Sequence, residues 1–222
     1  MAGEVLMDAV TPLPAASLIV LRDDPFEVLM LRRHEKSSFV PNAWVFPGGI
    51  AEGSDAQLGD GSLLDTMRVT AVRETFEETG VWLGAPLEDA ERKRRELLAG
   101  NIRFNELANE APIDLTQLVW TSRWITPVGI PKRFDTYFFL AIVSRNAVAT
   151  AEQNEVVDVA WLHPTTALQK HAAREMQMVF PTLRSLEALI GFANAAELLD
   201  SRRDAIIEAV EPVLVNGKPT LR

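Results

Sequence analysis

The chain has 222 residues and contains no cysteine, one tyrosine and three histidines. Without cysteine it can form no disulfide, no thiolate metal site and no cysteine nucleophile. Basic residues are also few: 22 Lys and Arg stand against 31 Asp and Glu, a formal net charge of −9. This excess of negative charge disfavours non-specific binding to nucleic acid or to an anionic membrane. The composition favours a protein of a reducing cytoplasm whose partners are neither nucleic acids nor membranes.

Long hydrophobic runs are missing as well. A run such as 15–21 is too short to span a bilayer. Residues 1–14 carry acidic residues and no basic ones, which is not the pattern of a secretory signal. Hydrophobic residues make up 47% of the chain and charged residues 24%, as in ordinary globular proteins. A chain of this length predicts one well-packed domain with a small addition.

Hydrophobic patterning and turn residues divide the chain into β-type and helical segments. We expect strands at residues 15–21, 26–31, 44–46, 118–125, 133–143 and 156–162. We expect helices at residues 62–79, 86–98 and 101–109, and in several pieces from 164 to 210. This alternation predicts an α/β (α+β) fold with a C-terminal helical extension. The β-rich segments disfavour an all-helical pyrophosphohydrolase with Glu-Glu metal motifs.

Two charged regions have simple interpretations. The run at 91–96 could form an anion site, but a solvated helix face is the favoured interpretation. The tail at 165–210 has nearly balanced basic and acidic residues, so it has no electrostatic footprint for DNA. We expect the tail to be a packing or dimerising cap, which leaves a homodimer open.

Three glutamates, Glu74, Glu77 and Glu78, follow one another at i, i+3 and i+4. On an α-helix this spacing places their carboxylates on one face. Like charges at i and i+4 destabilise a helix by about 0.2–0.5 kcal/mol for each pair, so a cation is expected in front of them. Clustered carboxylate oxygens suit Mg²⁺ or Mn²⁺. The opposite face is apolar and should be buried: Val69, Val72 and Phe76.

This helix resembles the Nudix box of the Nudix hydrolase superfamily, a Gly, five residues, Glu, seven residues and Arg-Glu-U-x-Glu-Glu-x-Gly-U, where U is bulky and apolar. The matching residues are Arg73, Glu74, Glu77, Glu78, Gly80 and Val81. Asp65 stands where the pattern has its first Glu, and Thr75 occupies an apolar slot. Gly59 satisfies the spacing formally, but the Gly-Gly at 48–49 is the better structural match. That match leaves a ten-residue insertion, 50–59.

The resemblance extends to one subgroup, which contains the peroxisomal coenzyme A diphosphatase of animals and its bacterial homologues. Four segments carry it: residues 44–49, 73–80, 131–139 and 180–189. The longer coenzyme A signature is only partly present, as Leu-Met-Leu-Arg-Arg at 29–33. The similarity covers about residues 13–200 and implies an α/β/α sandwich with a mixed sheet.

The resemblance also implies roles for individual residues. Glu74 and Glu78 would be the main metal ligands, Glu77 would share a second ion, and a backbone carbonyl at Gly48 or Gly49 would complete the sphere. Arg73 would orient the glutamates by charge-assisted hydrogen bonds.

The expectations for the remaining polar residues are less specific. Glu155 could be a base or an extra ligand, with Glu152 as the fallback, but an exposed loop acid fits Glu155 equally well. Arg133 and Asp135 alternate with the β period of two, and they would either contact substrate or form an internal ion pair. His34, His163 and His171 show no metal or nucleophile spacing. The five tryptophans are expected in the core: Trp44, Trp82, Trp120, Trp124 and Trp161.

We therefore interpret residues 13–164 as a Nudix hydrolase domain and 165–210 as a helical extension packed on it. The implied function is Mg²⁺- or Mn²⁺-dependent hydrolysis of a diphosphate in a small nucleoside diphosphate derivative, with coenzyme A or acyl-CoA as candidates. ADP-ribose, dinucleotides and nucleotide sugars stay open, as does a non-catalytic nucleotide-binding module. For the insertion at 50–59 we expect removal to alter KM or substrate preference and to leave metal binding by the helix largely unchanged.

Overall fold

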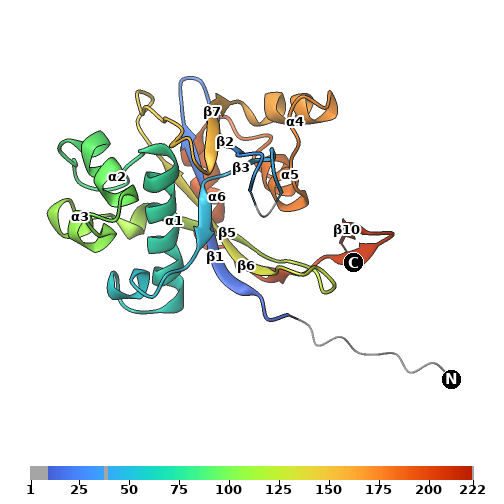
Figure 1. Cartoon of the computed structure of the whole chain (residues 1–222). Helices are drawn as coiled ribbons and strands as arrows, with labels where there is room; N and C mark the ends of the chain where they lie inside the picture. The colour runs from blue at the N-terminus through green and yellow to red at the C-terminus, as the bar shows by residue number, and fades with distance from the viewer. Residues whose placement is uncertain (1–9, 38–39, 222) are drawn as a thin grey trace.

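In the computed structural model, which describes residues 10–37 and 40–221, a mixed sheet lies between two sets of helices (Figure 1). Residues 1–9 of the acidic N-terminal stretch lie outside the described residues. The strand order is β3-β2-β1-β6-β5-β8, with β4 paired to β1 and β7 to β2. The pairs β1–β6 and β5–β8 are parallel, whereas the other pairs are antiparallel. The strands are β1 (Leu13–Arg22), β2 (Glu27–Arg33), β3 (Trp44–Val45), β4 (Gly48–Ile50), β5 (Val119–Ile125), β6 (Phe134–Ile142), β7 (Val156–Leu162) and β8 (Ala209–Val210).

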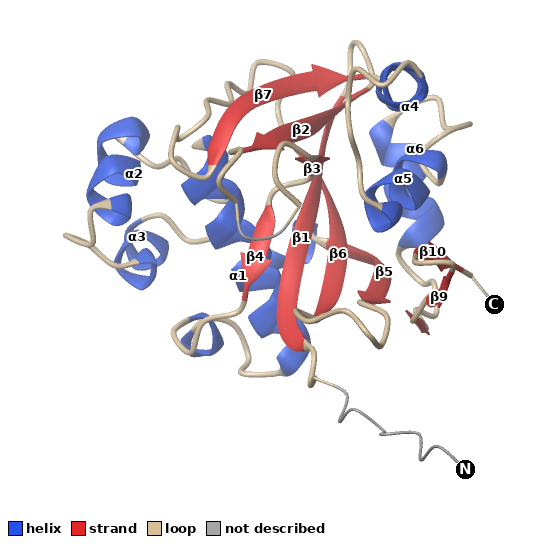
Figure 2. Cartoon of the chain, turned by 45° about the vertical axis from the view of Figure 1, so that its right-hand side comes forward, coloured by secondary structure: helices blue, strands red, loops and turns tan. Residues whose placement is uncertain are grey.

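The helices cover both faces of the sheet (Figure 2). One face carries α1 (Leu63–Thr79), α2 (Ala90–Leu98) and α3 (Phe104–Glu110), together with the short 3-10 helices η1 (Asp55–Gln57) and η2 (Leu115–Gln117). The other face carries α4 (Pro164–Ala172), α5 (Phe180–Glu187) and α6 (Ala195–Arg202). In the described part of the chain no helix is long and apolar enough to cross a membrane.

Strand β1 shows why the sheet needs helices on both sides. Leu18 and Val20 belong to the core on the α1 side, whereas Ile19 and Leu21 belong to the core on the α5–α6 side. Successive side chains of a strand point to opposite faces, so a strand buried on both faces reads as one continuous hydrophobic run. The near-continuous apolar sequence of β1 follows from this position at the centre of the sheet.

Helix α1 has the limits that its sequence predicts. The Ser62 side chain accepts a hydrogen bond from the Asp65 N–H and caps the first turn. Gly80 closes the helix in the left-handed conformation at φ +76°. The stripe of Val69, Val72 and Phe76 is fully buried against the sheet. The predicted α/β/α sandwich and its mixed sheet are confirmed.

The structure differs from the expected elements in two places. Helix α2 begins at Ala90 rather than at residue 86, because Ala85 donates to the Pro112 carbonyl at 2.9 Å and Gly84 forms a β-bridge with Ile113. The extension at 165–210 is not helical throughout, since its end forms β8 on the main sheet. A hairpin of β9 (Val213–Val215) and β10 (Lys218–Thr220) follows. The domain boundary at residue 164 stays a prediction.

Candidate active site

The acidic face of α1 packs against β4, where Glu78 contacts Gly48 and Glu74 lies against Gly49. Glu78 is 5% exposed, and the side chains of Glu74 and Glu77 are 16% and 23% exposed. Helix geometry thus brings together the three carboxylates that the sequence places at i, i+3 and i+4.

Arg73 forms hydrogen bonds with two of the three glutamates. Its Nη1 donates to Glu74 Oε1 at 3.0 Å and to Glu77 Oε2 at 3.1 Å, and its Nη2 donates to the Ile50 carbonyl at 3.0 Å. Burial would lower the pKa of Arg73, but hydrogen bonds to Asp55 and the charges of Glu74 and Glu77 outweigh burial and raise it. Arg73 therefore stays a cation in contact with the glutamates, in the place where an orienting role was expected.

Asp55, in η1, is a partner of Arg73 that the sequence did not reveal. It is completely buried, and it accepts from Arg73 Nε at 2.9 Å and Nη2 at 3.1 Å. It also accepts from Thr70 Oγ1 at 2.8 Å and from the Glu52 N–H at 2.9 Å. Its carboxylate thus joins the loop, the middle of α1 and Arg73 in one buried network.

This contact corrects the expectation for the insertion at 50–59. Removing those residues would remove Asp55 and leave Arg73 buried without its strongest partner, which is a costly arrangement. The insertion therefore belongs to the support of α1. Asp65, the acid in the box position, instead pairs with Arg68 at 2.7 Å near the start of α1.

The Gly-Gly pair at the start of β4 lies directly against the acidic face. The Gly48 N–H donates to Glu78 Oε2 at 2.9 Å. A Cβ added to Gly49 would lie 2.4 Å from Glu74 Oε1, so only glycine allows the backbone to come this close.

The electrostatics of the three glutamates are those of acids that lack a sufficient counter-charge. Burial raises the pKa of Glu77 to about 7 and also raises the pKa of Glu74. Burial, followed by the charge of Glu74, raises the pKa of Glu78 well above its usual range. A divalent cation in front of these carboxylates would supply the missing positive charge.

In the described residues no group of three or more Asp, Glu, His or Cys side chains is arranged to hold a metal ion by itself. An ion here would therefore take one or two carboxylates together with backbone carbonyls, water and substrate oxygens. Mg²⁺ is commonly bound in this way. The carboxylate oxygens of Glu74 and Glu78 are hard donors that fit such an ion, and Gly48 and Gly49 beside them have no side chains to obstruct it.

Glu155 faces the same region from the loop before β7. It is exposed, and its charge raises the pKa of both Glu74 and Glu78, after burial as the main cause. Glu152, the alternative, instead folds the loop: its carboxylate accepts from the N–H groups of Asn154 and Val156 at 2.9 Å, and from the N–H of Glu155. Of the two acids, Glu155 is the one that reaches the site.

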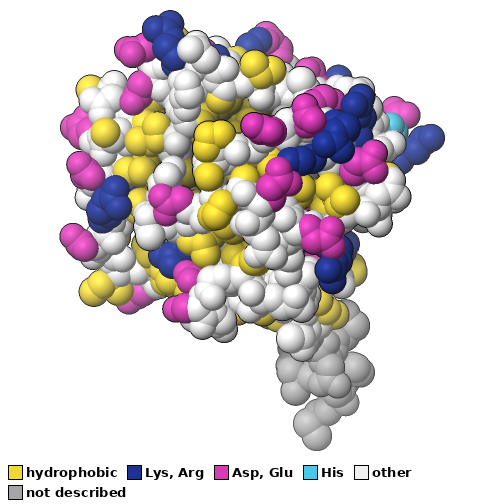
Figure 3. Space-filling view, turned by 90° about the vertical axis from the view of Figure 1, so that its left-hand side faces the viewer, with side chains coloured by type: hydrophobic (Ala, Val, Ile, Leu, Met, Phe, Trp, Pro, Cys, Tyr) yellow, Lys and Arg dark blue, Asp and Glu magenta, His cyan; other side chains and the backbone are white. Residues whose placement is uncertain are grey.

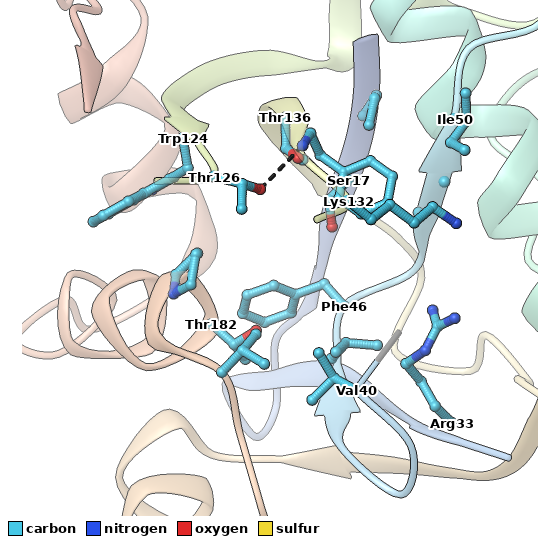
Figure 4. A pocket seen from close by; sticks show the side chains of 18 of the residues that line it. Ser17, Arg33, Val40, Phe46, Ile50, Trp124, Thr126, Lys132, Thr136 and Thr182 are labelled. Carbon is cyan, nitrogen blue, oxygen red and sulfur yellow. Dashed lines mark hydrogen bonds between the residues drawn. The ribbon is translucent and has the colours of Figure 1, made fainter. Parts of the chain in front are cut away.

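A cavity of about 1110 Å³ opens in front of the acidic face. It is slightly larger than the usual range for small-molecule sites, about 300–1,000 Å³. Glu52, Glu74 and Glu155 line it on the α1 side. Figure 4 shows Arg33 and Ile50 on one side, Trp124 and Thr182 on the other, and Phe46 between them. The second side is mainly apolar: Trp124, Phe138, Val179, Phe180 and Pro181.

Arg33, at the end of β2, points into this cavity (Figure 4). Among the described residues its side chain has no hydrogen bond or ion pair, and its Nε is buried without a partner. Its charge acts on Glu78 and opposes the effect of burial on the pKa of that carboxyl group. A free guanidinium beside a carboxylate cluster is suited to bind a phosphate.

Arg133 and Asp135 do not line the cavity, and they do not pair with each other. Arg133 donates to the carbonyls of Thr126 and Val10 and pairs with Glu211. Asp135 forms a two-point ion pair with Arg123 at 2.8 and 2.6 Å. The alternate residues of β6, Phe134, Thr136 and Phe138, line the cavity instead. The geometry therefore gives no support to substrate binding by Arg133 and Asp135.

The basic run of α2 is only partly a solvated face. Figure 3 shows acidic and basic side chains interspersed over this side of the molecule. However, Lys93 and Arg94 are 9% and 3% exposed, Lys93 pairs with Glu110, and Arg94 donates to the Glu77 carbonyl at 2.9 Å. The expectation of a solvated run is wrong at these two positions, because both cations face partners on other elements.

The histidines and tryptophans largely follow the expectations. His163 caps α4, and His171 contacts the Met176 carbonyl, whereas His34 lies at the cavity margin. Trp44 and Trp124 are buried, and the other three tryptophans pack against the core as partly buried rings. Of the five, Trp124 lines the cavity.

Comparison with known proteins shows which family this chain resembles. The family model described as the NUDT19 Nudix domain matches residues 59–189. The acyl-coenzyme A diphosphatase NUDT19 of Xenopus laevis is 29% identical over 238 residues, covering 78% of this chain and 62% of that protein. The protein of the same name from Homo sapiens is 26% identical, with 78% and 63% covered. The chain thus spans about six tenths of the length of these curated relatives.

Among solved structures, a Nudix hydrolase from Alicyclobacillus acidocaldarius is 28% identical and superposes with a TM-score of 0.77. That likeness covers 88% of this chain and 99% of the other. One assignment follows from three observations: the helix with the sequence Arg-Glu-x-x-Glu-Glu-x-Gly, the Gly-Gly pair of β4 packed on it, and the family match over more than half of the chain. The chain belongs to the Nudix hydrolase superfamily, in the group represented by NUDT19.

Proposed function

We propose that the chain hydrolyses the diphosphate linkage of a nucleoside diphosphate derivative, with coenzyme A or its acyl thioesters as the substrate class. The observation that carries the proposal is the two-sided cavity. Glu74 of α1, Glu155 and Arg33, whose guanidinium has no partner among the described residues, lie on one side, and the other side is apolar. A molecule with a charged diphosphate and a long, weakly polar arm matches both sides.

The metal would be held by Glu74 and Glu78, with contributions from Glu77 and the Gly48 carbonyl, and we propose Mg²⁺ or Mn²⁺. Such an ion, when bound, neutralises phosphate oxygens and lowers the pKa of bound water. Arg73 keeps Glu74 and Glu77 in place through its hydrogen bonds at 3.0 and 3.1 Å.

Two further residues act on the substrate in this proposal. Arg33 binds the diphosphate, because its guanidinium points into the cavity and has no partner in the described part of the chain. Glu155 accepts the proton of the attacking water at its carboxylate, since it is the loop acid that lines the cavity. Small molecules are the only partners that we propose, and the cytoplasm is the proposed location.

The arm of the substrate would lie against Trp124 and Phe180, whose rings meet edge to face at 5.9 Å. The names of the relatives support this choice, since two of them are called acyl-coenzyme A diphosphatase. ADP-ribose, dinucleotides and nucleotide sugars share the diphosphate but lack the apolar arm.

The test is a substrate panel of coenzyme A, a medium-chain acyl-CoA, ADP-ribose, a dinucleoside polyphosphate and a nucleotide sugar, each with Mg²⁺ and with Mn²⁺. Products are resolved by chromatography. We expect the CoA compounds to give adenosine 3′,5′-bisphosphate and a phosphopantetheine. In Phe180→Ala, KM should rise about tenfold for acyl-CoA, as the loss of about 1.4 kcal/mol of apolar contact implies, and change little for ADP-ribose.

Preferred cleavage of ADP-ribose or a nucleotide sugar, with Phe180→Ala without effect, would contradict the substrate class and leave the diphosphatase chemistry intact. Tight binding of nucleotides with no cleavage of any panel member would favour the non-catalytic module instead.

A further inference from the structure

The C-terminal end of α1 is held by a cation from a different helix. Arg94 of α2 is 3% exposed, its Nε donates to the Glu77 carbonyl at 2.9 Å, and its Nη1 donates to Thr150 Oγ1 at 2.9 Å. Among the described residues no carboxylate lies within ion-pair distance of it. Burying a guanidinium without an ion pair costs free energy, so we expect Arg94 to have a role other than ion pairing.

The last turn of α1 explains part of this arrangement. The final carbonyls of a helix lack partners within the helix and carry partial negative charge, which a cation stabilises. The last turn of α1 contains no basic residue of its own. Gly80 leaves the space for Arg94, because a Cβ there would lie 3.3 Å from Arg94 Nη1.

The second contact of Arg94 leads to the loop that carries Glu155. The Thr150 hydroxyl accepts the hydrogen bond from Arg94 Nη1, and the Thr150 backbone N–H donates to the Thr79 carbonyl at 2.9 Å. Two residues further on, the Glu152 carboxylate binds the N–H groups of Asn154, Glu155 and Val156. Hydrogen bonds therefore connect the end of α1 to Arg94 and Thr150, and the backbone from Thr150 to Glu152 connects this group to the bonds that fold the loop around Glu155.

We propose that Arg94 is a positioning residue, which keeps the last turn of α1, with Glu78, in register with the 147–155 loop, whose Glu155 lines the cavity. The inference rests on the proposed function of that cavity. Arginine suits the role because its planar fork binds two acceptors in fixed directions, whereas a lysine ammonium at the same place keeps the charge and loses this geometry.

The test compares Arg94→Lys and Thr150→Val with Lys93→Met. Lys93 is the matched control: it is the preceding residue of the same helix and is also buried, but it pairs with Glu110, away from α1. Three quantities are measured: amide hydrogen exchange of the apoprotein, Mn²⁺ affinity by calorimetric titration, and kcat and KM on the best substrate.

For Arg94→Lys and Thr150→Val we expect faster exchange at the Thr150 amide and in the last turn of α1. Metal affinity or kcat should fall by about 10–100-fold, as when the supports of metal ligands are removed, while KM stays within about twofold. Lys93→Met should lower the melting temperature without changing Mn²⁺ affinity, kcat or exchange at Thr150.

A purely structural role for Arg94 would give a different result. Both variants would then melt earlier, like Lys93→Met, with unchanged Thr150 exchange, Mn²⁺ affinity and kcat, and the proposal would be overturned. If the wild-type protein cleaves no substrate, the proposed function fails, but exchange and Mn²⁺ affinity still decide whether Arg94 positions the site.

Discussion

Helices α1 and α2 are neighbours with dense charge, yet their charges have different origins. On α1 the acids repeat at helical spacing and one of them, Glu74, lines the cavity, so residues close together in the sequence form the candidate ligand set. On α2 the buried cations have partners far away in the sequence: Glu110 and the Glu77 carbonyl are 17 residues from Lys93 and Arg94, and Thr150 is 56 residues from Arg94. Local spacing can reveal a ligand set, but the groups that hold such a set in place become visible only in the fold.

The largest expected effect is on α1 itself. Glu74→Gln and Glu78→Gln keep the side-chain shape and remove the charge that would hold the ion. We expect turnover to fall by about 10³-fold for each, equivalent to about 4 kcal/mol, in steady-state assays at saturating Mg²⁺. Asp65→Asn is the control on the same helix, because Asp65 pairs with Arg68 near the first turn. Nearly full activity in either Gln variant would place the metal site elsewhere.

The next effect tests whether α1 depends on support from distant residues. Asp55→Ala leaves Arg73 buried with its strongest partner removed, so we expect the free energy of unfolding in urea to drop by about 3–5 kcal/mol. Deleting residues 50–59 should be at least as damaging. Glu52→Gln is the control, because Glu52 lies in the same loop and reaches Arg73 only at 3.8 Å with a 63% exposed side chain. A loss of less than about 1 kcal/mol for Asp55→Ala would show that Arg73 finds other partners.

The smallest effect separates the two kinds of charge within α2. Arg92 makes an exposed contact with Asp89 at 3.4 Å, with both side chains more than half exposed. Arg92→Ala should therefore change the free energy of unfolding by less than about 0.5 kcal/mol, with unchanged Mn²⁺ affinity. Because Arg92 lies two positions before Arg94, an effect as large as that of an Arg94 substitution would mean that the whole basic face of α2 acts together.

The same contrast explains which features could be predicted. The apolar run of β1 and the caps of α1 are local patterns, so this strand and the main helix were predictable from them, whereas the sandwich was expected from the resemblance of the Arg-Glu-x-x-Glu-Glu-x-Gly helix to the Nudix box. Asp55 was not, because its loop carries the composition of an exposed turn while its carboxylate is buried under Arg73. The face of β6 was ambiguous as well: Phe134, Asp135 and Thr136 are all half-buried, so period two alone could not decide between Asp135 and its two neighbours.

Arg33 illustrates a different limit. Its place beside the acidic face depends on the pairing of β2 with β1 and on the turn into β4, which no spacing within residues 29–33 specifies. The sequence contains only a partial signature at 29–33. The fold shows that the Arg33 guanidinium lines the cavity and has no partner among the residues that the structure describes.

The central claim is that the carboxylates of α1 form a site for a divalent ion in the folded protein. The most direct measurement is the thermal unfolding of the metal-free wild type and of Glu78→Gln with increasing Mn²⁺. At a hundredfold excess over the dissociation constant, an ion that binds the folded state alone stabilises it by about 2.7 kcal/mol. We predict a concentration-dependent rise in Tm for the wild type that Glu78→Gln largely abolishes. An equal rise in both proteins, or none in the wild type, would contradict the claim.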